Sequence, residues 1–170
     1  MIESIDKLAV NVVKLLSETG RKAATAESCT GGLVSAAITS VSGSSEVFEM
    51  GVCSYANRIK KKALNVSAEA LENYGAVSEQ VAMEMAAGVM IISGSDFGVS
   101  TTGIAGPTGG SEEKPVGTVW IGVCSKDSCR AERFLFGTDD CPDSMTEREY
   151  IRRQAACKAL EMLRDEIEQY

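Results

Sequence analysis

The 170-residue chain contains no histidine. This absence excludes Ser-His-Asp and Cys-His catalysis and every metal site that needs an imidazole ligand. Any nucleophile in this protein must therefore be activated by a lysine, a tyrosine, a carboxylate or the backbone. The six cysteines include no Cys-x-x-Cys pair, so we do not expect a zinc site or any other bound metal.

The chain also lacks an excess of basic residues, because 17 Lys and Arg stand against 24 Asp and Glu and give a net charge of −7. Sequence-independent nucleic-acid binding depends on neutralising phosphates, so we expect no nucleic-acid partner. No apolar stretch reaches the roughly 20 residues of a membrane span, and the first segment resembles an amphipathic helix rather than a signal peptide. We therefore expect a cytoplasmic protein without membrane contact, whose thiols, Cys124 and Cys129 included, are free.

Helical and strand patterns alternate along the chain. Hydrophobic spacing predicts helices over residues 3–19, 33–43, 57–64 and 67–75, a longer helix capped by Ser78, and a closing helix that contains residues 151–163. The longer helix is expected to bury Val81, Met85, Val89 and Ile92. Strands are predicted over residues 22–26, 47–55 and 97–101, followed by a hairpin of 116–125 and 129–136. Together they predict one domain over residues 1–170 with an α/β fold, a three-layer α/β/α sandwich around a mixed β-sheet.

The run Thr25–Gly32 (TAESCTGG) lies where the first predicted strand gives way to a helix. A turn of this kind exposes backbone N–H groups and the positive end of a helix, which suits an anionic ligand or a developing oxyanion. Ser28 and Cys29 are both candidate nucleophiles in this run. The alternative is a helix start that is simply capped by a serine or threonine.

A second candidate segment contains Tyr55 and Lys60. Tyr55 ends a predicted strand, and Lys60 lies in the first turns of the next helix, from where its side chain could point back toward the strand end. Partial desolvation near another cation would lower the pKa of Lys60 and allow it to act as a base. The alternative is a solvated basic helix, which we expect for Lys61 and Lys62.

The loop Thr102–Gly110 contains four glycines and one proline directly after a buried strand. Ligands of α/β sheets bind beyond the carboxyl ends of strands, and glycine lets the backbone approach them closely. The loop matches neither the Walker motif nor the dinucleotide fingerprint. In the closing helix, Arg152 and Arg153 diverge by about 100°, so at most one of them faces a site, where it could bind a phosphate.

In this order, these segments resemble the CinA C-terminal domain family, whose stand-alone members include nicotinamide-nucleotide amidases of the PncC type. The segment 138–147 is longer than the family pattern has before the last helix, and we expect the chain to lack the N-terminal nucleotide-processing domain of larger members. The resemblance covers nearly the whole chain, through Thr25–Gly32, Gly43–Ser45, Tyr55 with Asn57 and Lys60, Gly75–Glu79, Gly103–Pro107, Gly109–Trp120 and Arg152–Ala155.

The resemblance implies hydrolysis of the carboxamide of nicotinamide mononucleotide to nicotinate mononucleotide and ammonia in pyridine-nucleotide recycling, without metal or cofactor. It implies a Ser28 nucleophile that works with Lys60 and Tyr55, and a homo-oligomeric assembly. Amides of the glycines would stabilise the oxyanion, and Arg152 with the Thr102 loop would hold the 5′-phosphate. The residues implied to bind the substrate are Thr30, Gly31, Gly32, Ser45, Thr102, Gly103 and Arg152.

Two other functions stay open. One is a non-catalytic nucleotide-binding or interaction module of the same fold, linked to competence or DNA damage. The other is an amidase for a different small amide. The presence of Ser28, Tyr55 and Lys60 together favours the enzyme, because a pure binding module has no use for a base beside a hydroxyl.

Overall fold

The computed structural model describes residues 4–170. Its elements alternate as expected, with strand ends that differ from the prediction by one or two residues. In chain order they are α1 (Ile5–Thr19), β1 (Ala23–Glu27), α2 (Leu33–Thr39), the short 3₁₀ helix η1 (Ser44–Glu46), β2 (Phe48–Cys53), α3 (Asn57–Leu64), α4 (Ala68–Tyr74), α5 (Glu79–Ser93), β3 (Phe97–Gly103), β4 (Thr118–Cys124), β5 (Cys129–Leu135) and α6 (Glu147–Gln169).

The strands form one mixed sheet in the order β2-β1-β3-β4-β5. Strand β1 pairs in parallel with both β2 and β3, whereas β3–β4 and β4–β5 are antiparallel. The predicted mixed sheet and its antiparallel hairpin are therefore confirmed. Because β1, β2 and β3 run the same way, their carboxyl ends meet at one edge of the sheet, which is where α/β proteins bind ligands.

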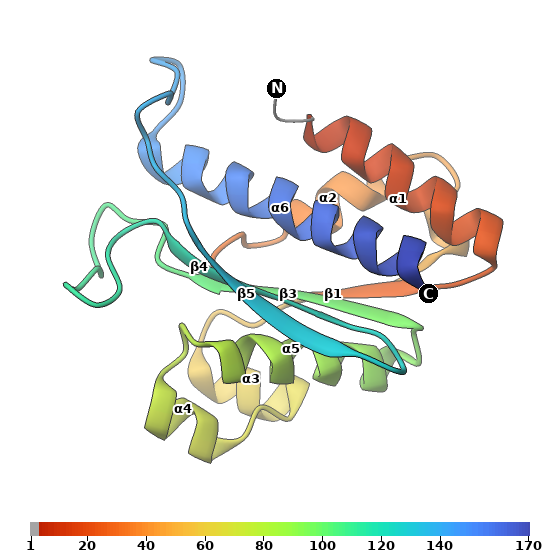
Figure 1. Ribbon diagram of the computed structural model, residues 1–170, viewed down its shortest axis with the longest axis horizontal. Coiled ribbons are helices and arrows are strands. Elements are labelled where there is room, and N and C mark those ends of the chain that lie inside the picture. The colour runs from red at the N-terminus through yellow and green to blue at the C-terminus, as the bar shows by residue number, and fades with distance from the viewer. Residues whose placement is uncertain (1–3) are drawn as a thin grey trace.

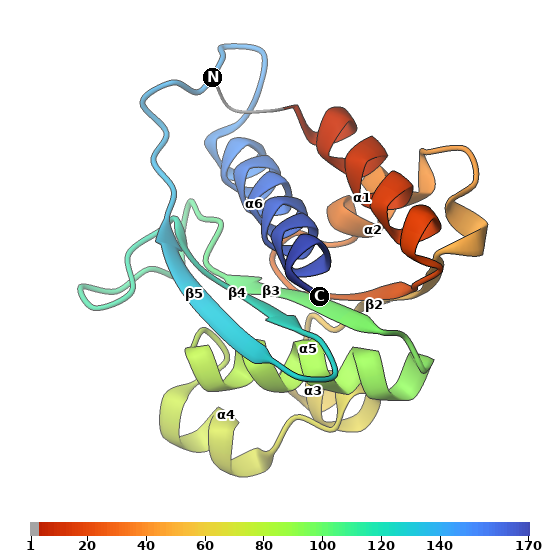
Figure 2. The ribbon, with the colours of Figure 1, turned by 45° about the vertical axis from the view of Figure 1, so that its right-hand side comes forward.

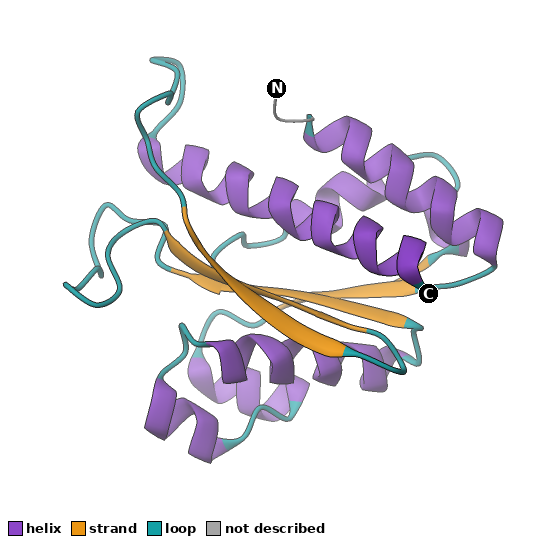
Figure 3. Ribbon diagram, in the orientation of Figure 1, coloured by secondary structure: helices purple, strands orange, loops and turns teal. Residues whose placement is uncertain are grey.

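Helices cover both faces of the sheet (Figures 1 and 3). Helices α1, α2 and α6 lie on one face, and α3, α4 and α5 lie on the other. The view of Figure 2 shows α1 and α6 side by side over the sheet, and these two helices pack against each other. The predicted three-layer α/β/α sandwich is confirmed. No helix within residues 4–170 is long and apolar enough to span a membrane.

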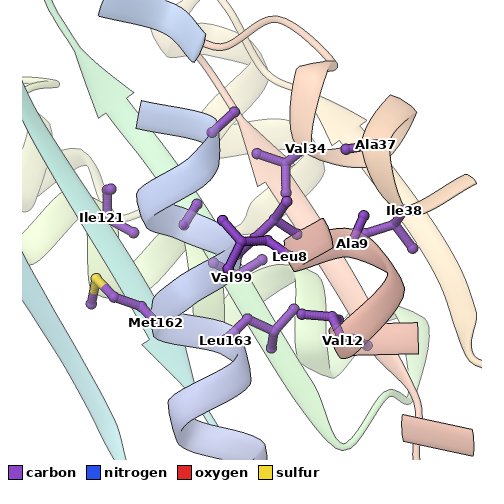
Figure 4. Close-up of a cluster of buried hydrophobic side chains, with 14 of the residues drawn as sticks. Leu8, Ala9, Val12, Val34, Ala37, Ile38, Val99, Ile121, Met162 and Leu163 are labelled. Atoms are coloured by element: carbon purple, nitrogen blue, oxygen red, sulfur yellow. The ribbon is translucent and has the colours of Figure 1, made fainter. Parts of the chain in front are cut away.

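The larger core cluster lies between the sheet and α1, α2 and α6 (Figure 4). Leu8, Val12 and Leu16 recur every fourth residue of α1, so one stripe of this helix is buried against α6 and the sheet. Burying each such side chain stabilises the fold by about 1.5–3 kcal/mol. Helix α1 ends at Gly20, whose φ of +64° favours glycine. Residue 3 of the predicted first helix lies outside the described residues.

Helix α5 departs from its predicted apolar face at one position. Val81, Met85 and Val89 are buried, but Ile92 is 46% exposed. The neighbouring Met90, which is half-buried, lies against Gly98 of β3. The predicted caps are confirmed, since the side chains of Ser67 and Ser78 accept hydrogen bonds from backbone N–H groups at the starts of α4 and α5.

The structure contradicts the expectation of free thiols at the hairpin. Cys124 and Cys129 form a disulfide, because the register of β4 and β5 places them directly opposite each other. Strand β2 also ends at Cys53 rather than at Tyr55, so Tyr55 lies in the connection to α3.

Candidate active site

A cavity of about 280 Å³ lies at the carboxyl ends of the parallel strands. It is built by the turn after β1, the β2–α3 connection, the segment before α5, the loop after β3 and the first turn of α6. The lining residues are Ser28, Cys29, Tyr55, Asn57, Lys60, Ala76, Val77, Thr102, Gly103, Ile104, Ala105, Gly106, Thr108, Gly109 and Arg148.

Ser28 and Lys60 are hydrogen-bonded inside this cavity. Lys60 belongs to the strongly basic α3, but together with Leu64 it forms the buried face of that helix. Its side chain points back toward the end of β2, as the sequence suggested, and Nζ donates to Ser28 Oγ at 3.0 Å. Nζ also donates to the carbonyl oxygens of Ser54 at 2.7 Å and Tyr55 at 3.3 Å. Lys61 is exposed, as expected.

The environment of Lys60 favours its neutral form. The side chain is only 1% exposed, and burial lowers its pKa from the ordinary value of 10.5. None of its three hydrogen-bond partners carries a charge. Of the two causes expected from the sequence, desolvation lowers the pKa of Lys60 and a neighbouring cation does not contribute.

Cys29 is poorly suited to be the nucleophile. Its thiol is 5% exposed and belongs to the core cluster. Burial raises the pKa of Cys29 to about 12. Since the thiolate is the reactive form of a cysteine, Cys29 stays protonated at neutral pH. Of the two neighbours, only Ser28 is hydrogen-bonded to Lys60.

The two glycine amides of the turn after β1 have hydrogen-bond partners within the protein. Gly31 and Gly32 have φ values of +61° and +99°, which favour glycine. The N–H of Gly31 donates to the carbonyl oxygen of Ser28 at 3.2 Å, and the N–H of Gly32 donates to Glu27 Oε2 at 2.9 Å. This geometry does not support the expected anion or oxyanion site at Gly31 and Gly32, because the carboxylate of Glu27 already occupies this helix start.

Other predicted substrate-binding residues divide between the cavity and its surroundings. Thr102 and Gly103 line the cavity, and the hydroxyl of Thr102 donates to the carbonyl oxygen of Ala76 at 2.7 Å. Thr30 is fully buried behind the turn and does not line the cavity. Ser45 lies in η1, is exposed, and does not line the cavity in this chain.

Of the tandem arginines, Arg152 faces the site and Arg153 faces outward. Arg152 donates to the carbonyl oxygens of Cys29 at 3.1 Å and Thr30 at 2.7 Å, and it does not line the cavity. Arg153 pairs with Glu149 on the surface of α6. The predicted phosphate ligand Arg152 is therefore engaged by the backbone of the turn.

The cavity-lining arginine is Arg148, which sequence reasoning missed. Its guanidinium donates to the carbonyl oxygen of Gly106 and, at 3.0 Å, to the hydroxyl of Tyr55. The available signal was its spacing, because Arg148 lies four residues before Arg152 and so on the same side of α6.

Tyr55 contributes its backbone and its hydroxyl to different partners. Its carbonyl oxygen helps to hold Lys60, whereas its side chain is 66% exposed and accepts the hydrogen bond from Arg148. Within residues 4–170, no hydrogen bond joins the Tyr55 hydroxyl to Ser28 or Lys60. A catalytic role of the phenol beside Ser28 and Lys60, which the resemblance implies, is therefore not supported by this geometry.

Fold and cavity together define a single-domain α/β protein with a buried serine–lysine pair at the ends of parallel strands. The sequence model of the CinA C-terminal domain matches residues 5–167, and the chain belongs to that family.

Similar proteins carry two kinds of name. The chain is 46% identical over 157 residues to the nicotinamide-nucleotide amidohydrolase PncC of Enterobacter agglomerans, and the match covers 92% of both chains. It is 45% identical to the CinA-like protein of Kosmotoga olearia, where the match covers 95% of this chain and 37% of that protein. The chain likewise spans little more than a third of several relatives named putative competence-damage inducible proteins.

Solved structures share the whole fold. The competence/damage inducible protein CihA from Agrobacterium tumefaciens aligns with a TM-score of 0.88 and 39% identity, over 97% of this chain and 96% of that one. The competence damage-inducible protein A from Klebsiella pneumoniae aligns with a TM-score of 0.90 and 29% identity, over 99% of each chain.

Proposed function

We propose that this protein is an amidohydrolase that converts nicotinamide mononucleotide to nicotinate mononucleotide and ammonia. The observation that carries the proposal is the 3.0 Å hydrogen bond between Lys60 Nζ and Ser28 Oγ inside a cavity. A base beside a hydroxyl is what nucleophilic attack on an amide requires, and this chain has no histidine to supply one. The name of the full-length Enterobacter relative supports the choice of substrate.

The contacts of Lys60 suit the role of general base. A neutral amine has two N–H groups and one lone pair. The carbonyl oxygens of Ser54 and Tyr55 accept from Nζ, so two acceptors are present for the two N–H groups of the neutral amine. In this neutral form the contact with Ser28 runs in the opposite direction, because the lone pair of Nζ accepts the hydroxyl proton of Ser28.

In the proposed reaction, Ser28 Oγ attacks the carboxamide carbon while its proton passes to Lys60 Nζ. The tetrahedral intermediate collapses as the ammonium of Lys60 returns the proton to the departing nitrogen, and ammonia leaves an ester on Ser28. A water molecule then attacks this ester, with Lys60 again taking and returning a proton. The acid is released and Ser28 is restored.

The oxyanion of the intermediate needs a donor other than the turn after β1, whose glycine amides are engaged. Gly103 remains as the glycine that was predicted for this role and that lines the cavity. It ends β3, the strand that pairs with β1, and the N–H of Ser28 donates to the carbonyl oxygen of Thr101 in this strand. We propose that backbone amides at Gly103 and the loop beyond it stabilise the oxyanion.

We propose Arg148 in place of Arg152 as the ligand of the 5′-phosphate. The lining residues include no Asp or Glu, and with Lys60 in its neutral form Arg148 is the cation among them. An arginine can bind a phosphate through two parallel N–H donors. Its present partners are the neutral oxygens of Gly106 and Tyr55, which an anionic ligand can replace.

The test is ammonia release from nicotinamide mononucleotide by chelator-treated protein, with Lys60→Ala and Lys61→Ala compared side by side. We expect turnover by the wild type and by Lys61→Ala, because Lys61 is an exposed residue of the same helix. Lys60→Ala should be inactive. Binding of the nucleotide without ammonia release by the wild type would instead identify a non-catalytic module. Equal turnover by both variants would remove Lys60 from the mechanism.

A further inference from the structure

We propose that Glu27 and Arg152 are positioning residues that hold the turn 28–32 from opposite sides and so set the distance between Ser28 Oγ and Lys60 Nζ. This inference rests on the proposed function. Neither residue lines the cavity.

Glu27 is a buried carboxylate whose hydrogen bonds all come from uncharged donors. It is 1% exposed, and burying an ionised carboxylate is very costly unless it is well hydrogen-bonded. Oε2 accepts from the Thr30 hydroxyl at 2.6 Å, the Gly32 N–H at 2.9 Å and the Val34 N–H at 3.1 Å. Oε1 accepts from the N–H of Ser35 at 2.8 Å and from its hydroxyl at 2.7 Å.

This arrangement is more than an ordinary helix cap. Gly32 occupies the cap position of α2 and has no side chain to accept a hydrogen bond. Glu27 is instead the last residue of β1, so its carboxylate ties the end of the strand to the start of the helix. Ser28 lies on the short chain segment between these two fixed points.

Arg152 holds the same turn through its carbonyl groups. It donates to the carbonyl oxygens of Cys29 and Thr30 from α6. Gly31 makes the approach possible, since a Cβ atom there would lie 3.0 Å from Arg152 Nη2. Within the turn, the N–H of Gly32 therefore meets the carboxylate, and the C=O groups of Cys29 and Thr30 meet the guanidinium. The two charges fix the peptide units that directly follow Ser28 along the chain.

The consequence for the reaction is geometric. Displacement of a reacting group by about 1 Å can cost about 100-fold in rate, even when the substitution lies away from the chemistry. Loss of either support should therefore lower kcat while leaving substrate affinity nearly unchanged.

The first test is Glu27→Gln, which keeps the shape but places an amide donor against backbone donors. We expect kcat to fall about 10- to 100-fold, with KM within about threefold of the wild type. The matched control is Glu84→Gln. Glu84 accepts from the N–H and hydroxyl of Ser67 before α4, away from the cavity, so its loss should lower thermal stability without changing kcat. Wild-type kcat in a folded Glu27→Gln protein would overturn the proposal.

The second test compares Arg152→Lys with Arg153→Lys. A lysine at position 152 cannot reproduce the two guanidinium hydrogen bonds, so we expect kcat to fall about 10-fold with little change in KM. Arg153→Lys should behave as the wild type, because Arg153 is exposed. A raised KM with wild-type kcat for Arg152→Lys would show that Arg152 binds substrate instead, and would overturn its positioning role.

A third variant and a substrate-independent readout keep the test decisive. If Glu27→Gln does not fold, Thr30→Val removes one hydroxyl that Glu27 and Thr101 share while keeping the shape. The readout is the rate at which phenylmethylsulfonyl fluoride modifies Ser28. Slower modification in the variants than in the wild type supports positioning even if nicotinamide mononucleotide is not the substrate. An unchanged rate in folded variants overturns it, whatever the turnover.

Discussion

Two glycine-containing segments follow the neighbouring parallel strands β1 and β3, and they are built in opposite ways. The turn after β1 is closed, because its glycine amides, the carbonyl groups of Cys29 and Thr30 and the buried hydroxyl of Thr30 have partners within the protein. The loop after β3 is open. Its residues 107–110 are exposed, and it supplies much of the cavity wall.

The difference separates two uses of glycine at a strand end. In the turn, glycine permits left-handed backbone and close approach of Arg152, and the result is a fixed support for Ser28. In the loop, glycine leaves backbone surface accessible to a ligand. The start of α2 has the composition of an anion-binding site, but the carboxylate of Glu27 already accepts hydrogen bonds from its N–H groups. The surface that is open to a ligand therefore lies in the loop after the neighbouring strand β3.

The largest expected effect is that of Ser28→Ala, which removes the reacting group that the closed turn supports. Turnover should be abolished with the fold intact. Cys29→Ala, in the same turn, should retain at least a tenth of wild-type kcat, because the buried thiol of Cys29 does not react. Ammonia release and far-ultraviolet circular dichroism measure activity and fold. The reverse ranking of the two variants would transfer the nucleophile to Cys29.

Lys60→Met should lower kcat by about 10²- to 10⁴-fold, the usual contribution of general acid–base catalysis. Methionine keeps a long apolar stem in the buried position without an amine. The steady-state kcat of this variant, compared with that of the wild type at the same pH, measures the contribution. A loss below about threefold would show that Lys60 supports the closed turn rather than the reaction.

The lowered pKa of Lys60 gives a pH dependence of defined sign. The neutral amine is the base, so kcat/KM should rise with pH through the lowered pKa, and Lys60→Met should lack this rise. Because the unfolded chain binds this proton up to about the ordinary value of 10.5, the wild type gains stability relative to Lys60→Met as pH rises toward that value. Denaturant unfolding at several pH values checks the second effect, and parallel stability curves would contradict it.

Arg148→Ala tests the cavity next to the open loop after β3, where Arg148 contacts Gly106. We expect KM for nicotinamide mononucleotide to rise about 10- to 100-fold with a smaller change in kcat, because a charge-assisted phosphate contact is lost. Arg153→Ala is the control, since Arg153 lies on the outer surface of α6. Titration with nicotinate mononucleotide should show the same loss of affinity. Unchanged product binding would place the phosphate elsewhere.

The smallest expected difference is between Gly31→Ala and Gly109→Ala. Both glycines have positive φ, so each substitution should cost about 1–2 kcal/mol of stability. Only Gly31→Ala also crowds Arg152, so it should lower kcat more than Gly109→Ala does. Thermal unfolding and kcat measure the two effects. Equal kcat values would show that the turn is less constrained than its contacts suggest.

The fold could be predicted because its signals are local. The spacing of Leu8, Val12 and Leu16, and the capping positions of Ser67 and Ser78, depend on neighbours within one helix. The departures arise where tertiary packing decides. Ile92 fits the helical period but lies off the face that packs on β3, and the cysteine pair depends on a strand register that composition does not give.

The sequence indicated which segments form the site, but it did not indicate every contact between them. The position of Lys60 after the β2 end indicated its direction, because a lysine in the first turns of a helix can reach back. The hydrogen-bond partners of Glu27 and Arg152 could not be predicted from the sequence. Each partner is a group whose position depends on how another segment of the chain packs. Arg148 was missed because its one signal, the spacing of four residues before Arg152, is weak beside a conspicuous arginine pair.

The cavity collects residues from five separate parts of the chain, and this affects how the site is regained during refolding. The Ser28–Lys60 contact closes a separation of 32 residues, and the Tyr55–Arg148 contact closes one of 93. Contacts between distant residues form late, because the entropy of loop closure must first be overcome. Recovery of amidase activity should therefore lag behind recovery of helical circular dichroism, and so report the docking of α6 as the last step of assembly.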